Sequence, residues 1–98
     1  MIFLRDLEKY ILDHKDNLTQ IDITIKLDAD SDTLYVQKTK ETYVYEDEGE
    51  AEAKVDEVRG NPGFAGIERG HKDAKINKSG EETAPETWTV KAKLNHIF

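Results

Sequence analysis

The amino-acid sequence predicts an α+β fold: a single antiparallel sheet of four or five strands, with an N-terminal helix and a short second helix on one face. Near the start of the chain, apolar residues recur at spacings of three and four, which is the pattern of an amphipathic helix. Two later segments alternate apolar and polar residues, which is the pattern of a strand with one buried face. The 98 residues fit one domain, residues 1–98, with the element order α-β-β-β-α-(β)-β.

The first expected element is the amphipathic helix. Asp16-Asn17 is expected to end it, because asparagine tolerates the left-handed backbone conformation that often follows a helix. The apolar stripe of this helix consists of Phe3, Leu7, Tyr10, Ile11, His14 and Leu18.

Two segments have the clearest strand pattern. In residues 20–28, isoleucine and leucine alternate with polar side chains, and residues 29–32 have the composition of a turn. In residues 87–94, Trp88 and three further apolar residues alternate with threonine and lysine. Each strand is therefore expected to bury one face and to expose the other.

Residues 33–46 also have an extended pattern, but the alternation changes parity within them. Leu34 and Val36 share one face, whereas Tyr43 and Tyr45 fall on the other. One long, half-polar strand would account for this. We favour two strands, 33–38 and 41–46, joined by a turn at Thr39-Lys40-Glu41, because a single strand would otherwise expose both tyrosines.

The second half of the chain carries weaker signals. Residues 50–59 fit either a helix or a strand, and Gly60 followed by Asn61-Pro62 favours a short helix that ends there. One weak strand is expected within residues 64–76, and residues 78–85 are expected to form a loop. Ile97 and Phe98 are expected to cover one end of the core.

The composition limits the functions that the chain can have. It contains no cysteine, which excludes disulfides and thiolate metal sites and fits a reducing compartment. The N-terminal segment becomes charged at Arg5, so it lacks the apolar run of a secretory signal, and no segment is apolar enough to span a membrane. We therefore expect a cytoplasmic protein that does not associate with membranes.

The net charge of −7 is unevenly distributed. Residues 1–58 contain 16 acidic and 7 basic side chains, whereas residues 59–98 contain 5 acidic and 7 basic ones. Within residues 41–57, eight acidic side chains accompany one lysine. Direct nucleic-acid binding is not expected, because it usually depends on a basic field, and a basic protein partner is favoured on electrostatic grounds.

No sequence motif indicates catalysis, a metal site or a cofactor. The segment Asp28–Asp32 places carboxylates at alternate positions, as the start of a calcium-binding loop does. However, Thr33 and Thr39 occupy the positions where that loop needs glycine and a bidentate glutamate, so a structural turn is the better interpretation. The glycine-rich segment 60–70 has neither the spacing of a P-loop nor that of a dinucleotide-binding motif, and it is interpreted as a plain loop.

The three histidines, His14, His71 and His96, lie in different segments and form no paired-ligand motif. The aromatic residues are of greater interest, because two tyrosines immediately precede the densest negative charge. If these tyrosines face outward, they can anchor a partner. The predicted partner-binding residues are Tyr43, Tyr45, Glu46, Asp47, Glu48 and Glu50.

The leading functional hypothesis is a non-enzymatic, acidic interaction protein that binds a basic protein surface through its 41–57 segment. One alternative is an inhibitor from a phage or mobile element that imitates nucleic acid, as anti-CRISPR proteins can. Another is a small phage or bacterial structural subunit that forms homo-oligomers by sheet-edge pairing, with strand 87–94 adding to a neighbouring sheet. An enzyme is the least favoured class.

Overall fold

The computed structural model describes residues 2–96, and within them it confirms the α+β fold with two helices. The first half of the chain forms β1 (Ile2–Phe3), the 3-10 turn η1 (Leu4–Asp6), α1 (Leu7–Asp13), β2 (Leu18–Asp28) and β3 (Thr33–Tyr45). The second half forms α2 (Glu48–Arg59), β4 (Phe64–Lys72), β5 (Lys75–Ile76), β6 (Glu82–Ala84) and β7 (Thr87–Asn95).

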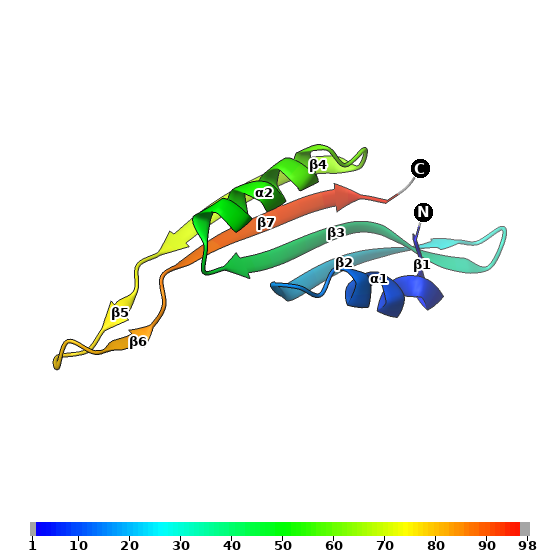
Figure 1. The fold of residues 1–98 in the computed structure, drawn as a ribbon. Helices are drawn as coiled ribbons and strands as arrows, with labels where there is room; N and C mark the ends of the chain where they lie inside the picture. The colour runs from blue at the N-terminus through cyan, green and yellow to red at the C-terminus, as the bar shows by residue number, and fades with distance from the viewer. Residues whose placement is uncertain (1, 97–98) are drawn as a thin grey trace.

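Five of the strands form one antiparallel sheet with β3 and β7 at its centre (Figure 1). β3 pairs with β2 along one side and with β1 and β7 along the other, and β4 pairs with the far side of β7. β5 and β6 form a separate hairpin that projects beyond the ends of β4 and β7. This hairpin and its two linkers, residues 73–86, are referred to below as the arm.

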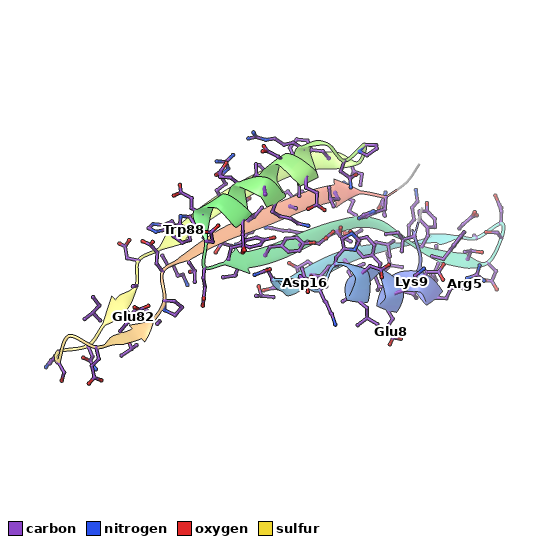
Figure 2. All side chains as sticks on the ribbon, viewed as in Figure 1. Arg5, Glu8, Lys9, Asp16, Glu82 and Trp88 are labelled. Carbon is purple, nitrogen blue, oxygen red and sulfur yellow. The ribbon has the colours of Figure 1, made fainter. Side chains whose placement is uncertain are left out.

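The core lies between the sheet and its helices, on one face of the sheet. α2 turns Ala51, Val55 and Val58 towards that face, where they meet β3 and β7. α1 contacts the same face, because Tyr10 of α1 reaches Glu41 of β3, beside the α2 contacts. The other face of the sheet has no helix over it (Figures 1 and 2).

β3 is one continuous strand, so the predicted division into strands 33–38 and 41–46 is wrong. The change of parity arises from a β-bulge: Thr24 pairs with Lys38 and Ile25 pairs with Val36, which leaves Gln37 as an extra residue. A bulge rotates the strand beyond it, so that residues on its two sides can share a face. Val36 and Thr39 are both buried as a result.

The predicted N-terminal helix is shorter than its apolar stripe. Phe3 lies in β1, paired with Tyr35 of β3, and Leu18 begins β2. α1 ends at Asp13, before the predicted end at Asp16-Asn17, and Asn17, directly before β2, has a φ of 63° in the left-handed region that asparagine tolerates. Backbone pairing with β3 therefore takes both ends of the stripe away from the helix.

The predictions for the second half of the chain are mostly confirmed. Residues 50–59 are helical, and the weak strand within 64–76 is β4. The loop expected at 78–85 is only partly correct, because β6 occupies part of it. The prediction for Ile97 and Phe98 lies outside the described residues.

The strand at 87–94 is present as β7, but it is not an edge strand. β3 and β4 occupy its two sides over most of its length, so it has no free edge with which to join a neighbouring sheet. The edges of the sheet are β2 and β4 instead. In residues 2–96, no helix is both long and apolar enough to cross a membrane.

Candidate functional site

The structure separates the two parts of the predicted binding site. Tyr43 and Tyr45 are 1% and 8% exposed and lie beneath α2 in the core, so their expected role as exposed anchors is wrong. Their burial follows from the bulge at Gln37, which sets the inward parity of the second half of β3. The four predicted acids that follow them, Glu46, Asp47, Glu48 and Glu50, are all exposed.

The exposed acids extend along the whole of α2 and the turn that precedes it. They are referred to below as the acidic surface, which comprises Glu46, Asp47, Glu48, Glu50, Glu52, Asp56 and Glu57. Lys54, the one lysine within this segment, is largely withdrawn from solvent: its side chain is 12% exposed, and its Nζ lies 4.1 Å from the centroid of the Tyr43 ring. The solvent-facing half of α2 is therefore strongly negative.

Some of these carboxylates have partners within the chain. Asp47 is the N-cap of α2, and its Oδ2 accepts a hydrogen bond of 2.9 Å from the backbone N–H of Glu50. Glu52 forms an ion pair of 2.8 Å with Arg69, and Glu57 lies 3.5 Å from Lys54 Nζ. Among the described residues, the other four acids form no ion pair: Glu46, Glu48, Glu50 and Asp56.

The arrangement of these acids along the helix opposes helix stability in part. Glu48, Glu52 and Asp56 follow one another at spacings of four, which places them in one row. Like charges at this spacing destabilise a helix by roughly 0.2–0.5 kcal/mol per pair. Glu48 and Glu50 lie in the first turn, where negative charge is favourable to the helix dipole, so only part of the acidic surface is explained by helix formation.

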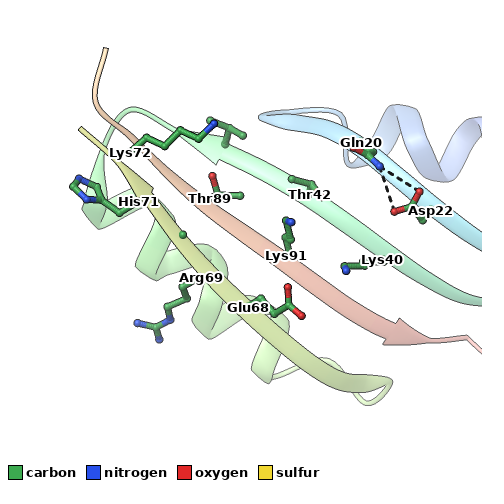
Figure 3. Close-up of a pocket in the computed structure, with 12 residues that line it drawn as sticks. Gln20, Asp22, Lys40, Thr42, Glu68, Arg69, His71, Lys72, Thr89 and Lys91 are labelled. Atoms are coloured by element: carbon green, nitrogen blue, oxygen red, sulfur yellow. Dashed lines mark hydrogen bonds between the residues drawn. The ribbon is translucent and has the colours of Figure 1, made fainter. Parts of the chain in front are cut away.

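The uncovered face of the sheet has the opposite charge. It is referred to below as the lysine face and is lined by Lys38, Lys40, Lys72, Lys91 and Lys93, with Asp22 and Glu68 as its acids. Lys40, Lys72 and Lys91, with the two acids, line a shallow hollow of about 600 Å³ across β2, β3, β7 and β4 (Figure 3), and Lys38 and Lys93 line a smaller hollow beside it. A hydrogen bond from Lys93 and the charge of that lysine lower the pKa of Glu68. Lys40 and Lys93 lie directly opposite each other in the ladder, which is unfavourable for like charges.

Comparison with known proteins does not add a family to these observations. No protein-family model, curated protein or solved structure matches the chain. The functional argument therefore rests on the geometry of the chain itself.

The least expected feature of the structure is a buried carboxylate in the centre of β3. Glu41 is 1% exposed, and three hydroxyl groups donate hydrogen bonds to it. Tyr10 and Thr39 donate to Oε2, each at 2.6 Å, and Tyr43 donates to Oε1 at 2.5 Å. Among the described residues Glu41 forms no ion pair, so neutral donors alone satisfy it.

Two histidines extend this cluster. The Thr39 hydroxyl has one proton, which it donates to Glu41, so it accepts the proton of His96 Nε2 across 2.7 Å. His14 Nδ1 donates to the carbonyl oxygen of Tyr10 across 2.7 Å, and the His14 and Tyr10 rings stack with centroids 4.3 Å apart. The cluster thus joins α1, the centre of β3 and the residue that follows β7.

The cluster lies at one wall of a cavity of about 350 Å³ between α1 and α2. Burial, reinforced by the hydrogen bond to Glu41, raises the pKa of both Tyr10 and Tyr43 well above the ordinary value of 10.0, so both phenols remain protonated donors. Burial also lowers the pKa of His96, and the negative charge of Glu41 opposes that shift. Every buried polar side-chain atom among the described residues has a partner. The main effect of the cluster is therefore structural: it connects α1, β3 and the end of β7 by hydrogen bonds.

Two groups in the structure were not predicted from the sequence. The sequence predicts a turn at Glu41, and the structure shows instead that Thr39, Glu41, Tyr43 and Tyr45 alternate along one strand and therefore share a face. The second group is His71, Asp73 and Glu86, whose ligand atoms converge at the base of the arm. The alternate spacing of His71 and Asp73 was a usable signal, but Glu86 is brought to them only by the pairing of β4 with β7.

The segment Asp28–Asp32 forms a turn, as the sequence predicts. Asp28 Oδ1 accepts a hydrogen bond of 3.1 Å from the backbone N–H of Asp30, and Asp32 has a φ of 52°. Asp28 therefore caps the turn locally, which is a common role of aspartate beside a reversal of the chain.

Proposed function

We propose that this chain is a non-enzymatic interaction protein that binds a basic protein surface through the acidic surface of α2 and its preceding turn. The observation that carries this proposal is the segregation of charge: exposed carboxylates are concentrated around α2, whereas the lysines of the sheet lie on the opposite face. Because Tyr43 and Tyr45 are buried, the binding surface differs from the one predicted from the sequence: it consists of charged side chains along one helix.

The proposal is supported by the acids of the acidic surface that have no ion-pair partner within the described residues. Arg69 and Lys54 are each engaged with one acid of α2, and the other five carboxylates of the acidic surface lie outside these pairs, Asp47 among them as the N-cap of α2. Carboxylates without an internal counter-ion produce a field that extends into solvent and increases the rate at which a basic partner is encountered. A row of like charges along α2 also has a cost in stability, which a binding function explains.

The test is a binding comparison between the wild-type chain and a variant with a neutralised surface. The variant carries Glu46→Gln, Glu48→Gln, Glu50→Gln and Asp56→Asn, and it keeps Asp47 because that side chain caps α2. A partner is captured from lysate of the native host at low salt with the wild-type chain, identified and purified. Its association rate is then expected to be about tenfold or more lower with the variant, with a smaller dependence on salt and little change in dissociation.

A matched control separates this effect from a general change in charge. Neutralisation of the lysine face by Lys40→Gln and Lys91→Gln is expected to leave the association rate with a basic partner unchanged or slightly increased. Equal association rates for the wild-type chain and the α2 variant would contradict the proposal. So would a larger loss with the lysine-face variant, because the lysine face would then be the docking surface.

The same purified partner distinguishes the nucleic-acid mimic from other interaction proteins. If the partner binds nucleic acid, double-stranded DNA or RNA is added to the preformed complex. Displacement of the chain supports imitation of a phosphate backbone, since both ligands then occupy one basic groove. A stable ternary complex removes that alternative and leaves the acidic surface as an ordinary docking surface.

A further inference from the structure

Three metal-ligating side chains converge where the arm joins the sheet. His71 is the second-last residue of β4, Asp73 begins one linker of the arm and Glu86 ends the other. His71 Nε2 lies 3.0 Å from Glu86 Oε2 and 3.7 Å from Asp73 Oδ1, and the ligand atoms of all three residues lie within 4.8 Å of one another. His71 lies at the margin of the hollow of the lysine face, but its imidazole and the side chain of Lys72 point in opposite directions from β4 (Figure 3).

The sheet holds the imidazole in place before any ligand arrives. His71 pairs with Trp88 across the β4–β7 ladder, and Lys72 pairs with Thr87. The Trp88 ring lies against the His71 ring, with centroids 5.3 Å apart and planes inclined by 38°. This contact restricts the orientation of the imidazole while its Nε2 faces the two carboxylates, and pre-organised ligands of this kind favour metal binding.

The group has an excess of negative charge that the chain does not neutralise. Asp73 and Glu86 share a single imidazole, and among the described residues neither forms another ion pair. Arg69, which lies on the same strand and contributes to a hollow beside Glu86 and Trp88, is already bonded to Glu52 at 2.8 Å. Two carboxylates this close repel each other, and a cation between them removes that repulsion.

We propose that His71, Asp73 and Glu86 bind a divalent transition-metal ion of the Zn²⁺ type. One imidazole nitrogen and two carboxylate oxygens are ordinary ligands of Zn²⁺ at roughly 2.0–2.2 Å, which puts adjacent ligand atoms roughly 3.0–3.4 Å apart. The observed separations of 3.0 and 3.7 Å reach this range through small side-chain movements. The imidazole favours Zn²⁺ over Mg²⁺ or Ca²⁺, and the exposure of the group leaves water to complete the coordination.

The position of the site gives the ion a structural effect. Asp73 and Glu86 belong to the two linkers that connect the arm to the sheet, and His71 belongs to the sheet itself. One ion bound to all three side chains ties both linkers to the end of β4. The bound ion therefore restricts the movement of the arm relative to the sheet.

The first test is titration of the full chain with Zn²⁺ by calorimetry. We expect saturable binding of one ion per chain, and an affinity about tenfold or more lower in each of His71→Ala, Asp73→Asn and Glu86→Gln. Glu82→Gln, which removes an exposed carboxylate elsewhere on the arm, is the matched control and is expected to bind like the wild-type chain. Far-ultraviolet circular dichroism without metal confirms that each variant is folded, as expected because none of the four positions is buried.

The second test reports the location of the ion directly. Trp88 is the one tryptophan of the chain, and it contacts a proposed ligand, so binding of paramagnetic Co²⁺ is expected to quench its fluorescence. Zn²⁺ should reverse the quenching and Mg²⁺ should not. Binding that is weak, spread over several equivalents and unaffected by His71→Ala would overturn the proposal, because the ions would then be associated with the acidic surface.

Amide hydrogen exchange tests the restriction of the arm. With Zn²⁺ bound, exchange in β5 and β6 is expected to slow in the wild-type chain and in Glu82→Gln, and to remain fast in His71→Ala. Exchange rates in the arm that do not change when one equivalent of Zn²⁺ binds would overturn the structural effect proposed for the ion.

Discussion

Glu41 shows how a single residue can connect separate parts of this small fold. Its carboxylate accepts hydrogen bonds from Tyr10 of α1 and from Thr39 and Tyr43 of β3, and Thr39 passes the connection on to His96. A buried ionic group is costly unless it is well hydrogen-bonded, and these donors offset that cost. The three hydroxyl groups are oriented to donate to this carboxylate, so its removal would leave buried donors without an acceptor.

Glu41→Gln is expected to destabilise the protein by about 2–3 kcal/mol, the range for loss of buried hydrogen bonds to a charged group. The amide keeps the size of the side chain but offers one acceptor oxygen in place of two, so the buried hydroxyls lose charge-assisted bonds. Urea unfolding measures the change in free energy. Glu57→Gln, at the exposed rim of the same cavity, is the control and is expected to change stability by no more than about 0.5 kcal/mol. A similar small change for Glu41→Gln would show that the hydroxyls have other partners.

The lowered pKa of His96 predicts that the protein loses stability in mild acid. Burial lowers its pKa in the folded protein below the ordinary value of 6.5, so the unfolded chain binds the proton more readily. This contribution to stability is therefore complete above pH 6.5 and is lost as the pH falls through that value towards the lower, folded pKa. The free energy of unfolding, measured by urea at a series of pH values, should fall less steeply below pH 6.5 in His96→Gln. Equal slopes in the two proteins would contradict the assignment.

Residue-level inference from the sequence worked for β7, where Val90, Ala92 and Leu94 are buried as their period of two predicts. In β2 the alternation is equally regular, but the expected buried face is wrong: Ile21 and Ile23 are only half-buried, and Ile25 and Leu27 are 47% and 54% exposed. The inference also failed for Tyr43 and Tyr45, because the extra residue Gln37 reverses the parity of β3 and nothing in its own chemistry marks it as a bulge. The position of a bulge is decided by which residues of the paired strand must be buried together, and a single strand does not contain that information.

At the scale of elements, local signals located the end of α2 well, its start less well, and α1 poorly. Gly60-Asn61-Pro62 follows the last residue of α2 as predicted, whereas the helix begins two residues before the predicted segment, after the N-cap Asp47, which was not predicted. The apolar stripe of the first helix continues through Phe3 and Leu18, but both residues belong to strands that pair with β3. A short helix has little stability of its own, so backbone pairing with a sheet can shorten it from both ends.

The distribution of charge also belongs to the scale of elements. The sequence showed that negative charge is concentrated in residues 41–57, and the structure keeps most of it exposed around α2. It could not show that the lysines of β3 and β7 gather on the opposite face, because that depends on strand order and register. The proposal for the acidic surface rests on this opposition of the two faces and not on the net charge alone.

The molecule as a whole is elongated. Its Cα radius of gyration is 16.6 Å, and its principal extents are 63, 23 and 18 Å. A compact domain of this length has a radius of gyration of about 13 Å. The arm contributes to the difference: none of residues 73–86 is fully buried, and Ile76 is 67% exposed. Sequence patterns indicate which side chains are buried in a core, but they do not show that a segment projects away from that core.

Replacement of the arm by a two-residue Asn-Gly turn between Lys72 and Thr87 is expected to leave the rest of the fold intact. Lys72 and Thr87 are paired at the end of the β4–β7 ladder, where a tight hairpin turn of this type can join them. The free energy of unfolding should change by no more than about 1 kcal/mol, because the arm supplies none of the buried core and a shorter connection has a smaller closure entropy. Urea unfolding followed by Trp88 fluorescence measures this change, and small-angle scattering should show a smaller radius of gyration. A loss of about 3 kcal/mol or more would mean that the arm stabilises the sheet. If instead the arm and its metal site are an addition to a domain that is stable without them, the shortened chain should remain folded and should no longer bind Zn²⁺.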